Sequence, residues 1–148
     1  MVVDQARRCD CMNFSLNEVH MTLRKALCGR GLAFGVADDF GAVGARMSAG
    51  EASDGIAAVL KHDNATLIAL LHRVETALSG DATGRSFLEP LEQSLAEHLL
   101  GTPFPQARAC AISEQSWQQA LKLSHLTYVP ETEASRLGGA GAGTNDND

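Results

Sequence analysis

The residues best suited to chemistry lie near the end of the chain, in the segment TYVPETEASRLGGAGAGTNDND. Tyr128, Glu133, Ser135 and Arg136 fall within nine positions and precede a glycine-rich run. Backbone N–H groups of such a run can form an anion-binding nest, and a guanidinium binds carboxylate or phosphate through paired hydrogen bonds. A small-anion site in this chain would therefore combine these side chains with Gly139, Gly141 and Gly143.

The glycine run does not match the common nucleotide-binding loops. GGAGAG has the spacing of neither GxGxxG nor GxxxxGK[ST], and the pattern predicts no strand before it and no helix after it. The terminal NDND begins like a calcium-binding EF-hand loop but lacks that loop's glycine and its distal glutamate. Two interpretations of the segment remain: a flexible tail, or an arm that docks on its own domain or on a partner.

Histidines are the other candidates for acid–base or metal chemistry. No two of them have the HxxxH spacing that places both rings on one helical face, and there is no HExxH motif. The sequence therefore predicts neither a metal site nor a cofactor. We interpret His72 as solvated, and we place His20 and His98 at the edges of buried stripes. The complete set is His20, His62, His72, His98 and His125.

The acidic pair Asp38 and Asp39 has two interpretations. Adjacent residues on a helix point about 100° apart, so we interpret the pair as two acids in a first turn, where the helix dipole favours them, rather than as a catalytic pair. Asp38 or His20 is nevertheless the helix-borne residue that would complete a site around Arg136.

Cysteines offer weaker candidates. Cys28 lies at the end of a predicted helix, where the dipole opposes a thiolate, so we do not favour it as a nucleophile. Cys110, next to alanines, is interpreted as a small buried hydrophobic residue. Together with the CxC at Cys9 and Cys11, the spacing fits no zinc ribbon or disulfide framework, which indicates reduced thiols.

Composition predicts one globular domain in the cytoplasm. The 148 residues are 45% hydrophobic and 20% charged, which is ordinary for a folded chain. The net charge is −6, and no basic cluster larger than a pair occurs, so nucleic acid is not an expected partner. No apolar run approaches the roughly 18 residues that span a bilayer, and MVVDQARRCDC lacks the apolar core of a signal peptide.

The first helix has the clearest start signal. Ser15 and Glu18 form an S-x-x-E capping box, and Phe14 with Val19 has the spacing of a hydrophobic staple, so a helix should begin at Leu16. A second helix is predicted over residues 33–47. Three glycines inside it lower helix propensity by roughly 1 kcal/mol each, and we expect them to allow tight packing against neighbouring backbone: Gly35, Gly41 and Gly44.

Four further helices and one short strand complete the predicted fold. A short helix covers residues 56–61, Asn64 caps a long helix, and another long helix spans residues 87–100, with Ser86 and Glu89 as a second S-x-x-E pair. Ser113 caps the last helix, and residues 107–112 form a possible short strand. The fold class is thus mainly α: a single compact domain of about five helices over residues 12–129, with an extended glycine-rich arm at 130–148. Residues 1–11 are predicted to be disordered, or an artefact if translation begins at Met12.

Both ends of the chain carry distinctive motifs. The opening FSLNEVHMTLRKALCGRGLAFGVADDFG contains SLNE, a GxGxxxGxA junction and an acidic pair, and the close contains YVP, SR, GAGAG and DND. Over about a third of its length the chain thereby resembles a bacterial family of short proteins catalogued as a domain of unknown function. The resemblance implies no activity. The matching positions are Ser15 to Glu18, Gly29, Gly31, Gly35, Ala37, Asp38, Asp39, Tyr128 to Pro130, Ser135, Arg136, 139–143 and Asp146 to Asp148.

Taken together, these patterns predict a non-catalytic accessory or interaction protein that uses its glycine-rich, acidic C-terminal arm. The alternative is a small enzyme or a carboxylate- or phosphate-binding protein with its site at Arg136 and the glycine run. A protein partner is expected in the first case, and a small anion in the second. No pattern in the sequence specifies catalytic residues or the oligomeric state.

Overall fold

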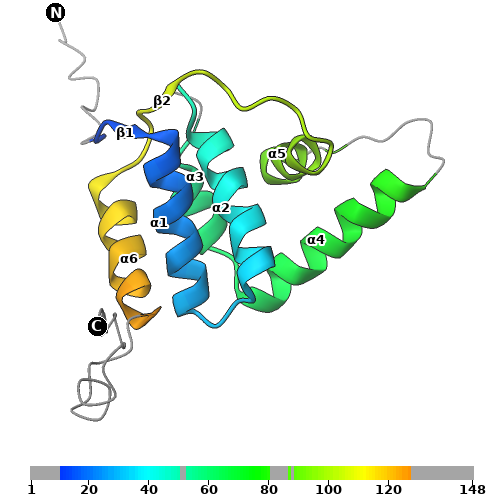
Figure 1. The fold of residues 1–148 in the computed structure, drawn as a ribbon, viewed down its shortest axis with the longest axis horizontal. Coiled ribbons are helices and arrows are strands. Elements are labelled where there is room, and N and C mark those ends of the chain that lie inside the picture. Colours follow the sequence, from blue (N-terminus) through cyan, green and yellow to red (C-terminus); the bar gives the residue numbers. More distant parts are fainter. Residues whose placement is uncertain (1–10, 51–52, 81–86, 88, 128–148) are drawn as a thin grey trace, which may run out of the picture.

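The computed structural model describes residues 11–50, 53–80, 87 and 89–127 (Figure 1). This part of the chain is mainly α-helical, with one small antiparallel β-pair, which confirms the predicted fold class. The predicted arm at 130–148 and the first ten residues lie outside the described residues. The elements are β1 (Phe14–Ser15), α1 (Leu16–Gly29), α2 (Phe34–Ser48), α3 (Gly55–Leu60), α4 (Asn64–Ser79), α5 (Pro90–Leu99), β2 (Arg108–Ala109), α6 (Glu114–Ser124) and the 3-10 turn η1 (His125–Thr127).

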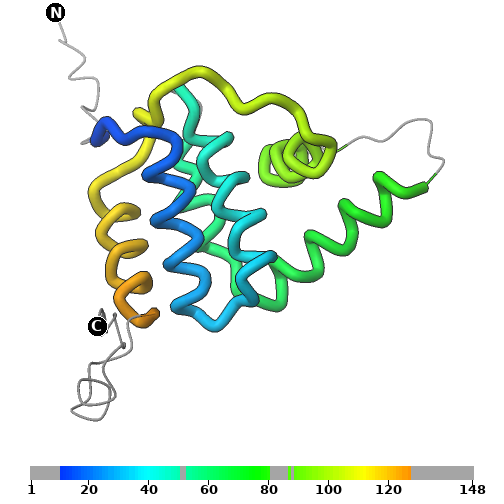
Figure 2. The backbone as a smooth tube through the Cα atoms, in the orientation of Figure 1, coloured from blue at the N-terminus to red at the C-terminus, as the bar shows by residue number. Residues whose placement is uncertain are grey.

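Helices α1 and α2 form an antiparallel pair at the centre of the molecule. α6 packs against the other side of α1, while α3 and α5 pack against α2 (Figure 1). The backbone trace shows α4 as the outermost helix, diverging from α2 with α5 beside it (Figure 2). The largest fully buried side chains come from α1 to α5 and from the segment before α6: Phe40, Leu23, Leu27, Ile56, Leu67, Leu95 and Ile112.

The N-terminus of α1 follows the sequence prediction. Ser15 Oγ accepts a hydrogen bond from the Glu18 backbone N–H at 3.1 Å, and the Glu18 carboxylate accepts one from the Ser15 backbone N–H at 2.7 Å. The hydrogen bonds that the Ser15 backbone N–H and hydroxyl donate to this carboxylate lower the pKa of Glu18. Phe14 stacks on Trp117 of α6, with ring centroids 3.7 Å apart, so the entry to α1 is also fixed to the last long helix.

The glycines of α2 meet the expectation at two of three positions. A Cβ at Gly41 would lie 2.8 Å from the His20 carbonyl oxygen, and one at Gly44 would press on the Leu23 side chain and the Gly55 backbone. These glycines therefore let α1 and α3 approach α2 closely. For Gly35 the prediction is wrong, because a Cβ there would meet nothing within 4 Å.

Two predicted helix starts need correction. Asp63, not Asn64, caps α4, and its carboxylate accepts a hydrogen bond from the Thr66 backbone N–H at 2.7 Å. The helix predicted from residue 87 begins only at Pro90, since proline has no N–H to donate and fits the first helical position. Glu89 is the N-cap of α5, but its side chain makes no capping bond.

The short strand predicted within residues 107–112 is β2. It pairs antiparallel with β1, Phe14 opposite Ala109, and Ala109 also bridges to Ala49 and Gly50 at the end of α2. The start of α1, the end of α2 and the approach to α6 are thus joined at one small ribbon. Within the described ranges, no helix is both long and apolar enough to cross a membrane.

Candidate functional site

The predicted arm site cannot be placed in the structure. Tyr128, Glu133, Ser135, Arg136, Gly139, Gly141 and Gly143 all lie outside the described residues. Their grouping into an anion site therefore stays a prediction. The two helix-borne residues assigned to the same site, His20 and Asp38, are described.

His20 and Asp38 lie together on adjacent helices. His20 Nε2 is 2.9 Å from Asp38 Oδ1, and Arg24 of α1 donates to the same oxygen at 3.3 Å. Partial burial raises the pKa of the Asp38 carboxyl, but the hydrogen bonds and positive charges of His20 and Arg24 outweigh this and hold the pKa below its usual value. A small hollow of about 190 Å³, lined by Leu16, Asn17, His20 and Phe104, lies beside the pair.

Asp39 makes the equivalent pair with α5. His98 Nε2 is 2.9 Å from Asp39 Oδ1, and both side chains are partly buried. The interpretation of the acidic pair as first-turn acids is wrong, because α2 begins at Phe34 and the first turn contains no acid. The roughly 100° between adjacent residues instead directs Asp38 to α1 and Asp39 to α5, so each carboxylate holds a histidine of a neighbouring helix.

The remaining candidates are scattered. His72 is solvated as predicted, with 77% of its side chain exposed. Cys28 is half-buried, and so is Cys110, whose thiol lies against the Gly50 carbonyl oxygen. In the part of the chain that the structure describes, no three His, Cys, Asp or Glu side chains are grouped to hold a metal ion.

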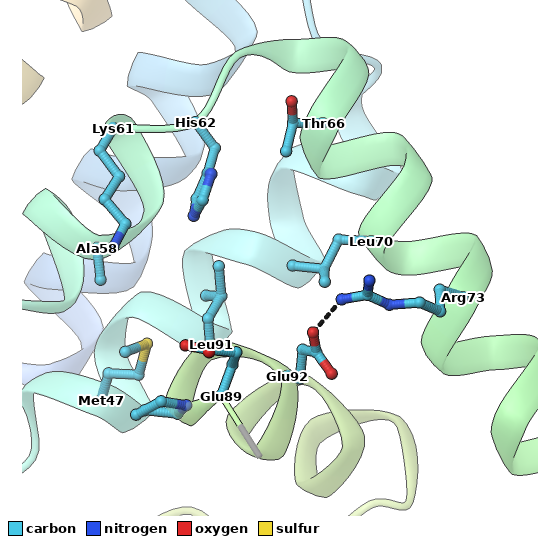
Figure 3. Close-up of a pocket in the computed structure, with 11 residues that line it drawn as sticks. Met47, Ala58, Lys61, His62, Thr66, Leu70, Arg73, Glu89, Leu91 and Glu92 are labelled. Carbon is cyan, nitrogen blue, oxygen red and sulfur yellow. Dashed lines mark hydrogen bonds and ion pairs between the residues drawn. The ribbon is translucent and has the colours of Figure 1, made fainter. Parts of the chain in front are cut away.

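A cleft of about 310 Å³ lies between the α3–α4 corner and the start of α5 (Figure 3). Its apolar lining comes from Met47 of α2, Ala58 of α3, Leu70 of α4, and Pro90 and Leu91 of α5. Polar side chains stand around this surface. They are Lys61, His62, Thr66, Arg73, Glu89 and Glu92.

Helical spacing explains which α4 residues line the cleft. Thr66, Leu70 and Arg73 are four and three positions apart, so they share one face of the helix. That face lies opposite the first turn of α5, where Arg73 forms an ion pair with Glu92 across the cleft (Figure 3). The pair joins α4 to α5, and Glu92 is the more buried partner.

The α3–α4 corner is held by Arg30, which follows α1. Its guanidinium donates to the carbonyl oxygens of Leu60 at 3.3 Å and His62 at 2.6 Å, and the Asn64 amide donates back to the Arg30 carbonyl at 2.9 Å. The carbonyls at the end of α3 thereby gain partners that the helix itself cannot supply. This network fixes the backbone from which Lys61 and His62 extend into the cleft (Figure 3).

In the cleft, a backbone fixed by hydrogen bonds carries charged side chains that could bind a ligand. Among the described residues, the side chains of Lys61 and Glu89 have no hydrogen-bond or ion-pair partner, whereas Arg73 and Glu92 neutralise each other. Sequence reasoning missed this site because its lining comes from four elements. The spacing of Thr66, Leu70 and Arg73 was the available signal, but it does not reveal what lies opposite.

No match was found when the chain was compared with protein-family models, with curated proteins and with solved structures. No family is therefore identified, and the resemblance to a bacterial family of uncharacterised proteins gains no support from these comparisons.

Proposed function

We propose that this protein is a non-catalytic accessory protein and that it binds a small ligand in the cleft between the α3–α4 corner and α5. The observation that carries the proposal is the cleft's combination of an aliphatic surface with charged side chains at its edge that have no partner in the described part of the chain. Ligand sites in proteins are typically concave and mostly apolar, with a few polar groups that orient the bound molecule. The volume of about 310 Å³ lies at the lower end of the usual range, which favours a small ligand.

The test is a thermal-shift screen against a metabolite panel, using a variant that fills the cleft. Thr66→Trp places a large ring at an exposed position of the lining. His72→Trp is the matched control, since it adds the same ring to the same helix at a solvated position. Compounds that stabilise the wild type should also stabilise His72→Trp but not Thr66→Trp. Equal stabilisation of both variants by every active compound would refute the assignment.

The arm predicted at 130–148 supplies the second part of the proposal, binding of a protein partner. Its support is the sequence, which combines Tyr128–Pro130, predicted to be extended because of its proline, with Arg136, glycines and an acidic end. One structural observation accompanies it: Leu126, four positions before the predicted arm, is 68% exposed. Deleting 137–148 should leave the melting temperature nearly unchanged and abolish co-purification with the partner. Retained co-purification would remove the arm from the proposal.

The alternative function, a small enzyme or small-anion binder centred on Arg136, is favoured by one observation. The two helix-borne residues assigned to it, His20 and Asp38, are hydrogen-bonded to each other. In that case phosphate or a dicarboxylate should stabilise the wild type and lose this effect in Arg136→Ala. If no anion stabilises the wild type, the alternative has no support.

Membership of the bacterial family that the two ends resemble, and a cytoplasmic location, also belong to the proposal. Both rest on the sequence: the family on the quoted motifs, of which the Ser15–Glu18 capping box forms as expected, and the location on a composition that is ordinary for a folded globular chain. Neither depends on the cleft.

A further inference from the structure

The unpaired charges of the cleft have opposite signs and come from opposite sides. Lys61 extends from the end of α3, whereas Glu89 stands at the start of α5 (Figure 3). Neither side chain has an ion-pair partner among the described residues. The other two charged side chains of the lining, Arg73 and Glu92, are already paired. The cleft therefore offers one cation and one anion to a ligand.

Between these two charges the lining is aliphatic. Met47, Leu70 and Leu91 contribute its larger side chains, and Ala58 leaves room beside them. Each is partly or fully buried, so contact with them is gained only by a molecule that enters the cleft with an apolar group of its own. An aliphatic ligand would remove this surface from water, which is the main source of affinity in such sites.

Charge balance argues against a simple anion. An isolated carboxylate beside Lys61 and His62 would also approach Glu89, and like charges without a counter-charge disfavour binding. A molecule that presents a carboxylate to Lys61 and an ammonium group to Glu89 satisfies both sides. Electrostatic matching of this kind contributes more to selectivity than to total affinity.

We infer that the cleft binds a small zwitterion with an aliphatic body, such as a free α-amino acid of the leucine type. The inference rests on the proposed function, because it names the ligand class of the same cleft. The small volume of the cleft fits one such molecule better than a longer chain. Lys61 and Glu89 then determine selectivity, and the aliphatic surface supplies contact area.

Isothermal titration calorimetry with three related probes tests the inference. L-leucine carries both charges, L-leucinamide lacks the carboxylate, and 4-methylpentanoate lacks the amine. The wild type should bind L-leucine more tightly than either of the other two, by up to about fivefold, the upper end of the effect of one solvent-accessible ion pair.

Two charge-removing variants assign each contact. Lys61→Gln should weaken L-leucine binding by up to about fivefold without weakening the binding of L-leucinamide. Glu89→Gln should weaken L-leucine binding by a similar factor without weakening the binding of 4-methylpentanoate, which is freed from a like charge. Neither side chain forms a hydrogen bond or an ion pair within the described residues, so both variants should fold normally. Lys122→Gln, on the exposed face of α6, is the control for an unspecific effect of charge.

The outcomes separate the inference from the proposed function. If 4-methylpentanoate binds the wild type as tightly as L-leucine does, the zwitterion inference is overturned and the cleft remains a ligand site. The same holds if none of the three probes binds but other compounds lose their effect in Thr66→Trp. If no compound of the panel is sensitive to Thr66→Trp, both the inference and the proposed function fail.

Discussion

Replacing Gly41 with alanine should destabilise the protein, although alanine is the better helix former. The new Cβ would lie 2.8 Å from the His20 carbonyl oxygen and equally close to the His20 ring, whereas ordinary contact begins at 3.4 Å. Because the oxygen belongs to the backbone of α1, the helix itself must move. Overpacking of this kind costs about 1–3 kcal/mol, against a helix-propensity gain of up to about 1 kcal/mol.

Gly35→Ala is the matched control on the same helix. A Cβ at this exposed position meets nothing within 4 Å, and the backbone has no positive φ there. The substitution should therefore stabilise the protein by about 0.5 kcal/mol, the lower end of the usual gain, because Gly35 lies in the first turn. The two variants make the same chemical change with opposite expected signs.

Thermal unfolding followed by circular dichroism measures the difference. Since the propensity gains largely cancel, the two melting temperatures should differ by the overpacking cost, and about 4 °C per kcal/mol for a domain of this size gives roughly 4–12 °C. The wild type should lie between the variants. If Gly41→Ala melts at or above Gly35→Ala, the close approach of α1 to α2 is not as described.

Three further substitutions probe the polar contacts that join the helices. Asp54→Ala should cost about 1–2 kcal/mol in urea unfolding, because one carboxylate oxygen accepts from the Ala57 N–H to cap α3 and the other accepts from the Ser113 N–H before α6; a loss below about 0.5 kcal/mol would contradict the double role. Arg30→Ala should cost about 2 kcal/mol of stability, because it leaves the carbonyls of the α3–α4 corner without their charged donor. It should also weaken the binding of any ligand in the cleft. Unchanged binding would show that other contacts position the corner. Asp38 has a lowered pKa in the folded state, so its contribution to stability is complete above the unfolded pKa of about 3.9 and is lost as the pH falls through the lower folded pKa. The wild type should therefore lose more stability than Asp38→Asn between about pH 4 and pH 2. Parallel profiles of stability against pH for the two proteins would refute this.

Local signals in the sequence were sufficient for most of the helices. Ser15 and Ser113 cap α1 and α6 as predicted, because a cap requires only a side chain and N–H groups two or three residues away. The start of α4 was misplaced by one residue, since Asp63 and Asn64 are both good caps. A contact with Arg30, 34 positions earlier, engages the Asn64 amide and leaves the cap to Asp63.

The candidate sites depended on contacts that spacing does not encode. Asp38 pairs with His20, 18 positions away, and Asp39 pairs with His98, 59 positions away. Only the arrangement of α1, α2 and α5 therefore reveals the two pairs. The cleft likewise requires α4 to lie against the first turn of α5. The sequence indicated which side chains are available for chemistry, and the packing of the helices decided which of them meet.

The ribbon around Ala109 also constrains the order of folding. The α1–α2 pair is joined by a short connection, so its contacts form at little cost in chain entropy. Pairing of Phe14 with Ala109 and its stacking on Trp117 instead close loops of roughly a hundred residues, and that cost grows with loop length. We therefore expect the central helix pair to form early and the ribbon late, so that weakening the Phe14–Trp117 stack chiefly accelerates unfolding. The junction that joins the ends of three helices would then determine the rate at which the folded protein unfolds.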